Sequence, residues 1–190
     1  MNLPNKLTLA RIILVPFYLA AMLIQFPYHF LVADAIFGIA SLTDMLDGKI
    51  ARKNNQITVF GKLCDPLADK MLTTAAFLAF MQLKICNIWV VMIILTREFL
   101  VTSFRLVATA QGVVIPAGIL GKIKTASQMI FSVAIMLGCQ YHCTVVDGVE
   151  VMAGNFALAS NILLWSTAVM TVISGIKYII DGVKVVDISK

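Results

Sequence analysis

The strongest constraint on how this chain can fold is a group of four aspartates inside a strongly apolar sequence. Hydrophobic residues make up 60% of the 190 residues and charged residues only 13%, yet four of the ten acidic residues lie between positions 44 and 69. Asp44 and Asp47 are three residues apart and Asp65 and Asp69 are four apart, so each pair lies on one face of a helix. The polar segment 53–56 lets the chain reverse between the pairs, which would bring the four carboxylates together.

Four carboxylates held this close in an apolar environment are stable only when cations neutralise them. Ligation by oxygen alone favours hard divalent ions, so the pattern predicts Mg²⁺ or Mn²⁺, as two ions, bound by the aspartates. The predicted metal ligands are Asp44, Asp47, Asp65 and Asp69. The alternative is that these carboxylates cap helix ends or face water.

The composition indicates an all-α, polytopic membrane protein. An average soluble domain is about half apolar and about a quarter charged, whereas this chain has a mean hydropathy of +0.93. At about 20 residues per span, about six transmembrane helices fit into the chain as one bundle, which predicts a single domain over residues 1–190. The helices are expected at about 1–25, 30–52, 58–83, 88–109, 119–139 and 153–180.

The first apolar segment could by itself be a signal peptide, with 19–21 as a cleavage region. However, Asn5, Thr8 and Arg11 recur every three residues and give this segment a polar stripe. We therefore expect a retained first helix that lies partly in the membrane interface.

Lysine and arginine predict the orientation of the bundle. In the expected topology every basic residue except Lys84 falls on the side of the two termini. Cytoplasmic loops are enriched in Lys and Arg, so the reversal after Arg52 is expected to face the cytoplasm from the cell membrane. Helix rise then places both aspartate pairs roughly 8–16 Å into the bilayer.

Two other classes of site are disfavoured. The chain has no basic run with interleaved aromatic residues, so nucleic acid is not expected as a partner. Cys139, His142 and Cys143 lie close in sequence but lack a fourth ligand, which makes them a poor zinc site.

The spacing D-x2-D-G-x2-A-R-x8-G-x3-D-x3-D resembles the signature of the CDP-alcohol phosphotransferase family. Its matching positions are Asp44, Asp47, Gly48, Ala51, Arg52, Gly61, Asp65 and Asp69. The resemblance implies a homodimeric membrane enzyme in which all four aspartates bind metal and Asp69 is also the general base. It further implies that CDP-diacylglycerol lies against Gly48, Ala51, Arg52 and Gly61, with Asn5 and Thr8 near the cytidine.

A second set of residues predicts a phosphate-bearing, water-soluble acceptor. Arg97 and Arg105 are eight residues apart, about two helical turns, and therefore face the same way. Lys122, Lys124 and Thr125 open the following helix from the same, cytoplasmic side, where free N–H groups also attract anions. The alternative is that Arg97 pairs near Glu98 or snorkels, and that the lysines only mark helix ends.

Segments 96–105 and 121–125 resemble those of bacterial phosphatidylglycerophosphate synthases, a branch of this family. That resemblance implies transfer of the phosphatidyl group of CDP-diacylglycerol to sn-glycerol 3-phosphate, giving phosphatidylglycerol phosphate and CMP. Inositol phosphate is an alternative acceptor that charge does not separate from glycerol phosphate. From other classes, a cation transporter with buried carboxylates and a lipid-binding scaffold are the alternatives. The last helix and the tail carry no predicted role.

Overall fold

The computed structural model describes the backbone of residues 3–53, 59–112, 118–146 and 149–183. Within these ranges, nothing is said of the side chains of residues 3–6, 44–53, 59–67, 69, 110, 145–146 and 149–151.

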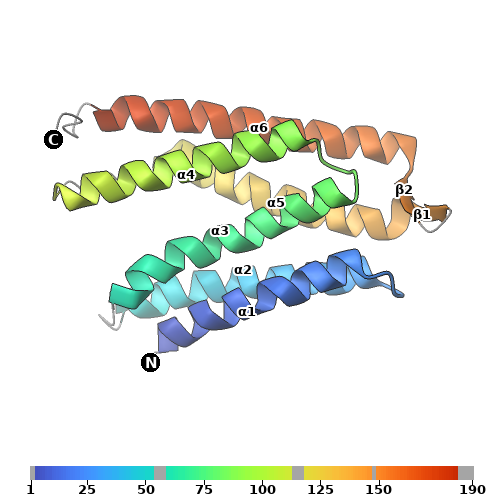
Figure 1. Cartoon of the computed structure of the whole chain (residues 1–190), viewed down its shortest axis with the longest axis horizontal. Coiled ribbons are helices and arrows are strands. Elements are labelled where there is room, and N and C mark those ends of the chain that lie inside the picture. Colours follow the sequence, from blue (N-terminus) through green and yellow to red (C-terminus); the bar gives the residue numbers. More distant parts are fainter. Residues whose placement is uncertain (1–2, 54–58, 113–117, 147–148, 184–190) are drawn as a thin grey trace.

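The described chain forms six helices and a small hairpin, arranged as a long bundle (Figure 1). The helices are α1 (Leu3–Leu23), α2 (His29–Lys53), α3 (Val59–Gln82), α4 (Ile88–Ala110), α5 (Ile119–His142) and α6 (Gly154–Val183). Successive helices run in opposite directions, so the start of α1 and the end of α6 lie at the same end of the bundle (Figure 1). The six predicted helices are therefore confirmed. Their ends differ from the predicted ones by at most three residues, as at 139 against 142 for α5.

A small hairpin lies between α5 and α6, in the segment that separates the last two predicted helices. Strands β1 (Cys143–Val146) and β2 (Val149–Met152) pair antiparallel, with Cys143 opposite Met152 and Val146 opposite Val149. β-Branched residues favour this extended pairing, and Asp147-Gly148 supplies the residue types of a two-residue turn.

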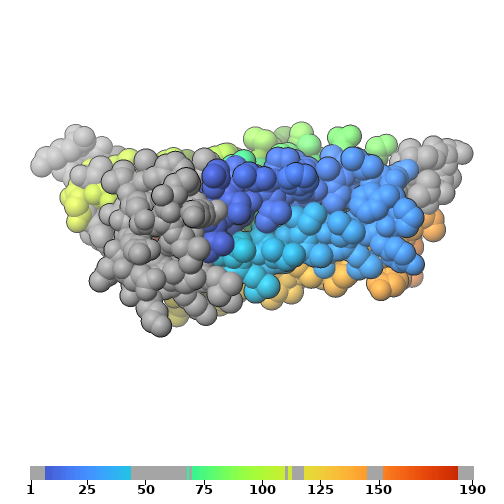
Figure 2. All heavy atoms as spheres, turned by 90° about the horizontal axis from the view of Figure 1, so that it is seen from below, coloured from blue at the N-terminus to red at the C-terminus, as the bar shows by residue number. Residues whose placement is uncertain are grey.

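The helices form two groups that meet along two seams. Helix α1 packs against α2 and α3, and helix α6 packs against α4 and α5. Contacts of α2 with α5 and of α3 with α4 join the groups. Seen from below, α1 and α2 lie side by side along one long face of the molecule (Figure 2).

The core contains both large and small apolar side chains. Tyr18 and Phe37 are almost fully buried, with ring centroids 5.8 Å apart between α1 and α2. Alanines such as Ala33, Ala76 and Ala168 are also buried, and small side chains let helix backbones approach closely.

Many large apolar side chains lie on the outer surface of the bundle, and some polar side chains are buried inside it. Large apolar side chains such as Phe17, Phe99 and Ile162 are about 60% exposed, whereas Gln128 and Thr171 are buried among the helices. Among the described residues, α5 and α6 are long and apolar enough to cross a membrane, and shorter apolar helical stretches occupy 7–23 and 29–43.

Exposed aromatic residues mark the end of the bundle that is away from the α2–α3 connection. Tyr28 lies between α1 and α2, Trp89 begins α4, and Tyr141 ends α5; their exposed fractions are 66%, 67% and 76%. Tyrosine and tryptophan are enriched at membrane–water interfaces because their rings are apolar with a polar atom at one edge.

We predict that Gly138→Ala lowers the stability of the α5–α6 contact. A Cβ at Gly138 would lie 2.0 Å from Cζ of Phe156, so the ring must move, and such overpacking costs about 1–3 kcal/mol. Thermal unfolding of the purified protein should show a midpoint lower by about 2–12 °C.

Gly38→Ala is the matched control, because Gly38 is also helical and has nothing within 4 Å of a Cβ. This control should unfold at the wild-type temperature or slightly above it, because alanine favours helix. Equal behaviour of the two variants would contradict the proposed role of the Gly138–Phe156 contact.

Candidate active site

The two segments that carry the aspartate signature lie at the same end of the bundle. Residues 44–52 form the last turns of α2, and residues 61–69 lie in the first turns of α3, on either side of residues 54–58. The side chains of the predicted metal and nucleotide ligands in these segments lie outside the described residues. They are Asp44, Asp47, Gly48, Ala51, Arg52, Gly61, Asp65 and Asp69, and the side chain of Asn5 also lies outside.

Helix α1 is held against α2 immediately before this segment. Nε of Arg11 donates a hydrogen bond to the carbonyl oxygen of Ala40 at 3.3 Å, and Arg11 is only 1% exposed. Thr8 is buried one turn earlier on α1. The carbonyl of Ala40 also accepts a 2.7 Å hydrogen bond from the hydroxyl of Thr43. Through Arg11, the polar stripe of α1 thus reaches the turn of α2 that precedes Asp44.

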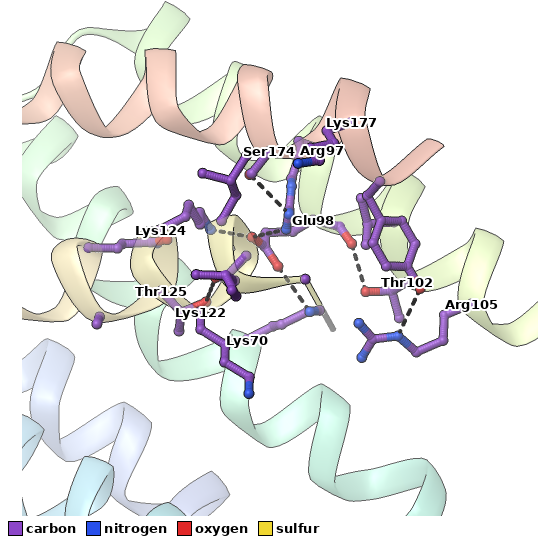
Figure 3. A pocket seen from close by; sticks show the side chains of 18 of the residues that line it. Lys70, Arg97, Glu98, Thr102, Arg105, Lys122, Lys124, Thr125, Ser174 and Lys177 are labelled. Carbon is purple, nitrogen blue, oxygen red and sulfur yellow. Dashed lines mark hydrogen bonds and ion pairs between the residues drawn. The ribbon is translucent and has the colours of Figure 1, made fainter. Parts of the chain in front are cut away.

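A cavity of about 870 Å³ is lined by residues of α3, α4, α5 and α6 (Figure 3), including Lys70, which directly follows Asp69 in the sequence. All five residues that the sequence predicts for the acceptor phosphate line it: Arg97, Arg105, Lys122, Lys124 and Thr125. The structure therefore brings this set together from α4 and α5, which are connected through residues 111–118.

Arg97 spans the cavity between α4 and α6. One terminal nitrogen donates to Oε1 of Glu98 at 3.2 Å, and the other donates to the hydroxyl of Ser174 at 3.1 Å. The pairing with Glu98 that the sequence left open as an alternative is thus present. Gly175 leaves room for this side chain, since a Cβ there would lie 2.8 Å from Cγ of Arg97.

Arg105 is held to the last helix nearer the end of the bundle. Its Nε lies 3.4 Å from the hydroxyl of Tyr178, and its guanidinium carbon lies 5.7 Å from the centre of the Tyr178 ring. This combination of a hydrogen bond and a cation–π contact fixes the direction of the guanidinium group.

The first turns of α5 form the opposite wall. Lys124 is 2% exposed and its ammonium group pairs with Oε1 of Glu98, whereas Lys122 is exposed. The hydroxyl of Thr125 donates to the carbonyl of Gly121 at 3.0 Å. Gly118 begins the helix without a side-chain cap, so backbone N–H groups of the first turn can donate to an anion.

Several lining residues were not predicted. Lys70 of α3 pairs with Oε2 of Glu98 at 2.9 Å, and α6 supplies Ser174, Lys177, Tyr178 and Asp181. The signal on α6 was available, because positions 174, 177, 178 and 181 interrupt an apolar helix at the spacing of one helical face.

The described lining is strongly cationic. Six cations (Lys70, Arg97, Arg105, Lys122, Lys124 and Lys177) face two carboxylates (Glu98 and Asp181), a net charge of +4. A cavity with this excess of positive charge suits a small ligand with more than one negative charge. Among the described side chains, no group of three or more His, Cys, Asp or Glu could hold a metal ion; the four signature aspartates are not part of that set.

Comparison with known proteins identifies the family. Residues 1–180 match the family described as CDP-alcohol phosphatidyltransferase. The chain belongs to this family. The match covers α1–α5 and most of α6, including Lys177 and Tyr178.

Relatives in this family carry names that agree with one another. The chain is 41% identical over 189 residues to the CDP-diacylglycerol–glycerol-3-phosphate 3-phosphatidyltransferase of Bacillus subtilis (strain 168), with 93% of each chain covered. It is 35% identical over 177 residues to the protein of the same name from Rickettsia bellii (strain RML369-C), again with 93% of each covered. A protein of that name from Pseudomonas fluorescens is 32% identical over 142 residues, which cover 72% of each chain.

We predict that Gly175→Ala weakens the binding of inorganic phosphate in the cavity. The new methyl group would displace the side chain of Arg97 and break the hydrogen bond to Ser174 that directs its guanidinium group, so that a bound phosphate would lose its hydrogen bond from Arg97. Loss of one hydrogen bond to a charged group corresponds to about tenfold in affinity. Isothermal titration with phosphate measures this change.

Gly154→Ala on the same helix has nothing within 4 Å of the added Cβ and is the matched control. It should bind phosphate as the wild type does. An unchanged phosphate affinity in Gly175→Ala would show that Arg97 does not need the space at Gly175 in order to bind phosphate.

Proposed function

We propose that the protein transfers the phosphatidyl group of CDP-diacylglycerol to sn-glycerol 3-phosphate, giving phosphatidylglycerol phosphate and CMP. Membership of the CDP-alcohol phosphatidyltransferase family and the shared name of its relatives support this reaction. The observation that carries the proposal is the position of Lys70. It lines the cationic cavity and directly follows Asp69 on α3, so the proposed acceptor cavity reaches the helix that bears two of the four signature aspartates, Asp65 and Asp69.

The proposed chemistry is a substitution at the phosphorus next to diacylglycerol. A hydroxyl oxygen of the acceptor forms the new bond to phosphorus, and the bond from phosphorus to the CMP oxygen breaks. Asp69 accepts the proton of the hydroxyl as general base, which in enzymes contributes typically ~10²–10⁴-fold. The cations at the cavity hold the acceptor's own phosphate by charge, so that its hydroxyl is directed toward α3.

The donor set fits a divalent metal. Asp44, Asp47, Asp65 and Asp69 would hold Mg²⁺ or Mn²⁺, as two ions, because carboxylate oxygens are the ligands that such ions prefer. Bound there, the ions would neutralise charge on the diphosphate and on the departing CMP.

The remaining signature residues are proposed to hold CDP-diacylglycerol. Gly48, Ala51 and Gly61 have small side chains that allow a nucleotide to approach the backbone. Arg52 would pair with a phosphate. Asn5 and Thr8 are proposed to lie near the cytidine, on the helix that Arg11 holds against α2.

We also propose that the bundle crosses the cell membrane six times with this site facing the cytoplasm. The apolar outer surface and the aromatic residues at the opposite end support the membrane. The basic residues at the end with the aspartate segments support the orientation. A lipid substrate with a charged head group would then meet the site at the interface.

The cavity lining also bears on the alternatives. A path for cations would be lined by acids, whereas this lining carries six cations and two carboxylates, which disfavours a cation transporter. Inositol phosphate carries the same phosphate group as glycerol phosphate, so it stays the alternative acceptor.

We predict that the purified protein releases CMP from CDP-diacylglycerol when sn-glycerol 3-phosphate is supplied. Acceptors are compared one at a time: glycerol 3-phosphate, inositol phosphate, serine and phosphatidylglycerol. Release with glycerol 3-phosphate alone is the expected result. Release with inositol phosphate alone would replace the acceptor but keep the chemistry, and release with none would reject the proposal.

We predict that Asp69→Asn loses CMP release by about a hundredfold or more, because the amide cannot accept the proton. Binding of CDP-diacylglycerol, measured separately by titration, should largely persist.

Chelation with EDTA should stop wild-type turnover, and added Mg²⁺ or Mn²⁺ should restore it. A fully active Asp69→Asn would refute its role as base, and full activity in the chelated protein would refute the metal.

A further inference from the structure

One carboxylate gathers cations from three helices inside the cavity. Glu98 of α4 pairs through Oε1 with Lys124 of α5 and with Arg97 of α4, and through Oε2 with Lys70 of α3 (Figure 3). The side chains of Glu98 and Arg97 are 17% and 14% exposed, and that of Lys124 is 2% exposed. The ion pairs are therefore largely shielded from water and are stronger than surface pairs.

The three cations are also the ones an anionic ligand would use. Lys70, Arg97 and Lys124 all line the cavity, and two of them were predicted from the sequence to bind phosphate. A phosphate monoester brings about −1.5 to −2 charges and three acceptor oxygens, against one charge and two oxygens for Glu98.

We propose that Glu98 is an internal competitor of the acceptor phosphate and thereby sets the charge that an acceptor must carry. Its carboxylate and the phosphate contend for Lys70, Arg97 and Lys124. A dianionic phosphate wins this competition because it offers more charge and more acceptor atoms, whereas a ligand with a single carboxylate does not. The inference rests on the proposed function only in taking the ligand to be a phosphate-bearing acceptor.

Two features of the structure favour competition over a purely structural role. The Glu98 backbone carbonyl is anchored separately by a 2.7 Å hydrogen bond from Thr102, so the side chain can turn without disturbing α4. Arg97 keeps its second partner, Ser174, on α6 when its bond to Glu98 is exchanged. The cations would thus stay in place while their anion changes.

The test is direct titration of the full-length protein with inorganic phosphate and with acetate. Glu98→Gln should bind phosphate about tenfold more tightly or more, because three cations lose a close negative charge. Acetate should bind this variant measurably but leave the wild type unaffected. The KM for glycerol 3-phosphate should fall in parallel.

Asp181→Asn is the charge-matched control, because Asp181 lines the same cavity and loses the same unit of charge. It should change phosphate affinity much less than Glu98→Gln does. If phosphate affinity rose equally in both variants, the change would be explained by the net charge of the cavity alone, and the proposal would be overturned. Weaker or unchanged phosphate binding in Glu98→Gln would also overturn it, by showing that Glu98 only positions the cations.

Glu98→Asp covers the case in which Glu98→Gln does not fold. The shorter side chain keeps the charge but withdraws it from the lysines, so phosphate should bind this variant more tightly than it binds the wild type. Unchanged or weaker binding would again reject the competition. Phosphate titration does not depend on the identity of the acceptor alcohol. If the wild type failed to release CMP with glycerol 3-phosphate, the proposed function would be rejected, but the titration would still test the competition between Glu98 and phosphate.

Discussion

Charges inside an apolar helical bundle must be neutralised by other charges, and this requirement organises the functional half of the protein. The four signature aspartates are expected to need bound cations, and the six basic side chains that line the cavity need negative charges near them. Only two carboxylates are present in the described lining to meet them. The excess of positive charge favours a negatively charged ligand, and the cavity reaches α3 at Lys70, next to Asp69 in the sequence.

The helices could be predicted because the signal comes from the chain itself. Apolar stretches of about 20 residues separated by polar turns correspond to α1–α6. These stretches can be recognised in the sequence without knowledge of any tertiary contact. The hairpin at 143–152 was missed although Asp147-Gly148 between valine-rich stretches is a hairpin signal. In a chain this apolar, two strands of four residues do not stand out from the long apolar helices on either side of them.

The basic residues of the cavity could be predicted from the sequence. The helical spacing of Arg97 and Arg105, together with the expected direction of each helix, places them on the same side of the membrane as Lys124. Their partners could not be predicted. The pairs of Glu98 with Lys70 and of Arg105 with Tyr178 join residues 28 and 73 positions apart, and these pairings depend on how α3, α4 and α6 pack. The functional roles of the aspartates stay predictions.

Gly175 has a consequence for the whole of α6. Adjacent residues of a helix point about 100° apart, so Arg97 can pass the helix only while the hydrogen atom of this one glycine faces it. If α6 turned by one residue, the side chain of Ser174 or Ile176 would take that place. The aliphatic part of the Arg97 side chain thereby restricts the axial rotation of the final helix, and with it the direction in which Tyr178 meets Arg105.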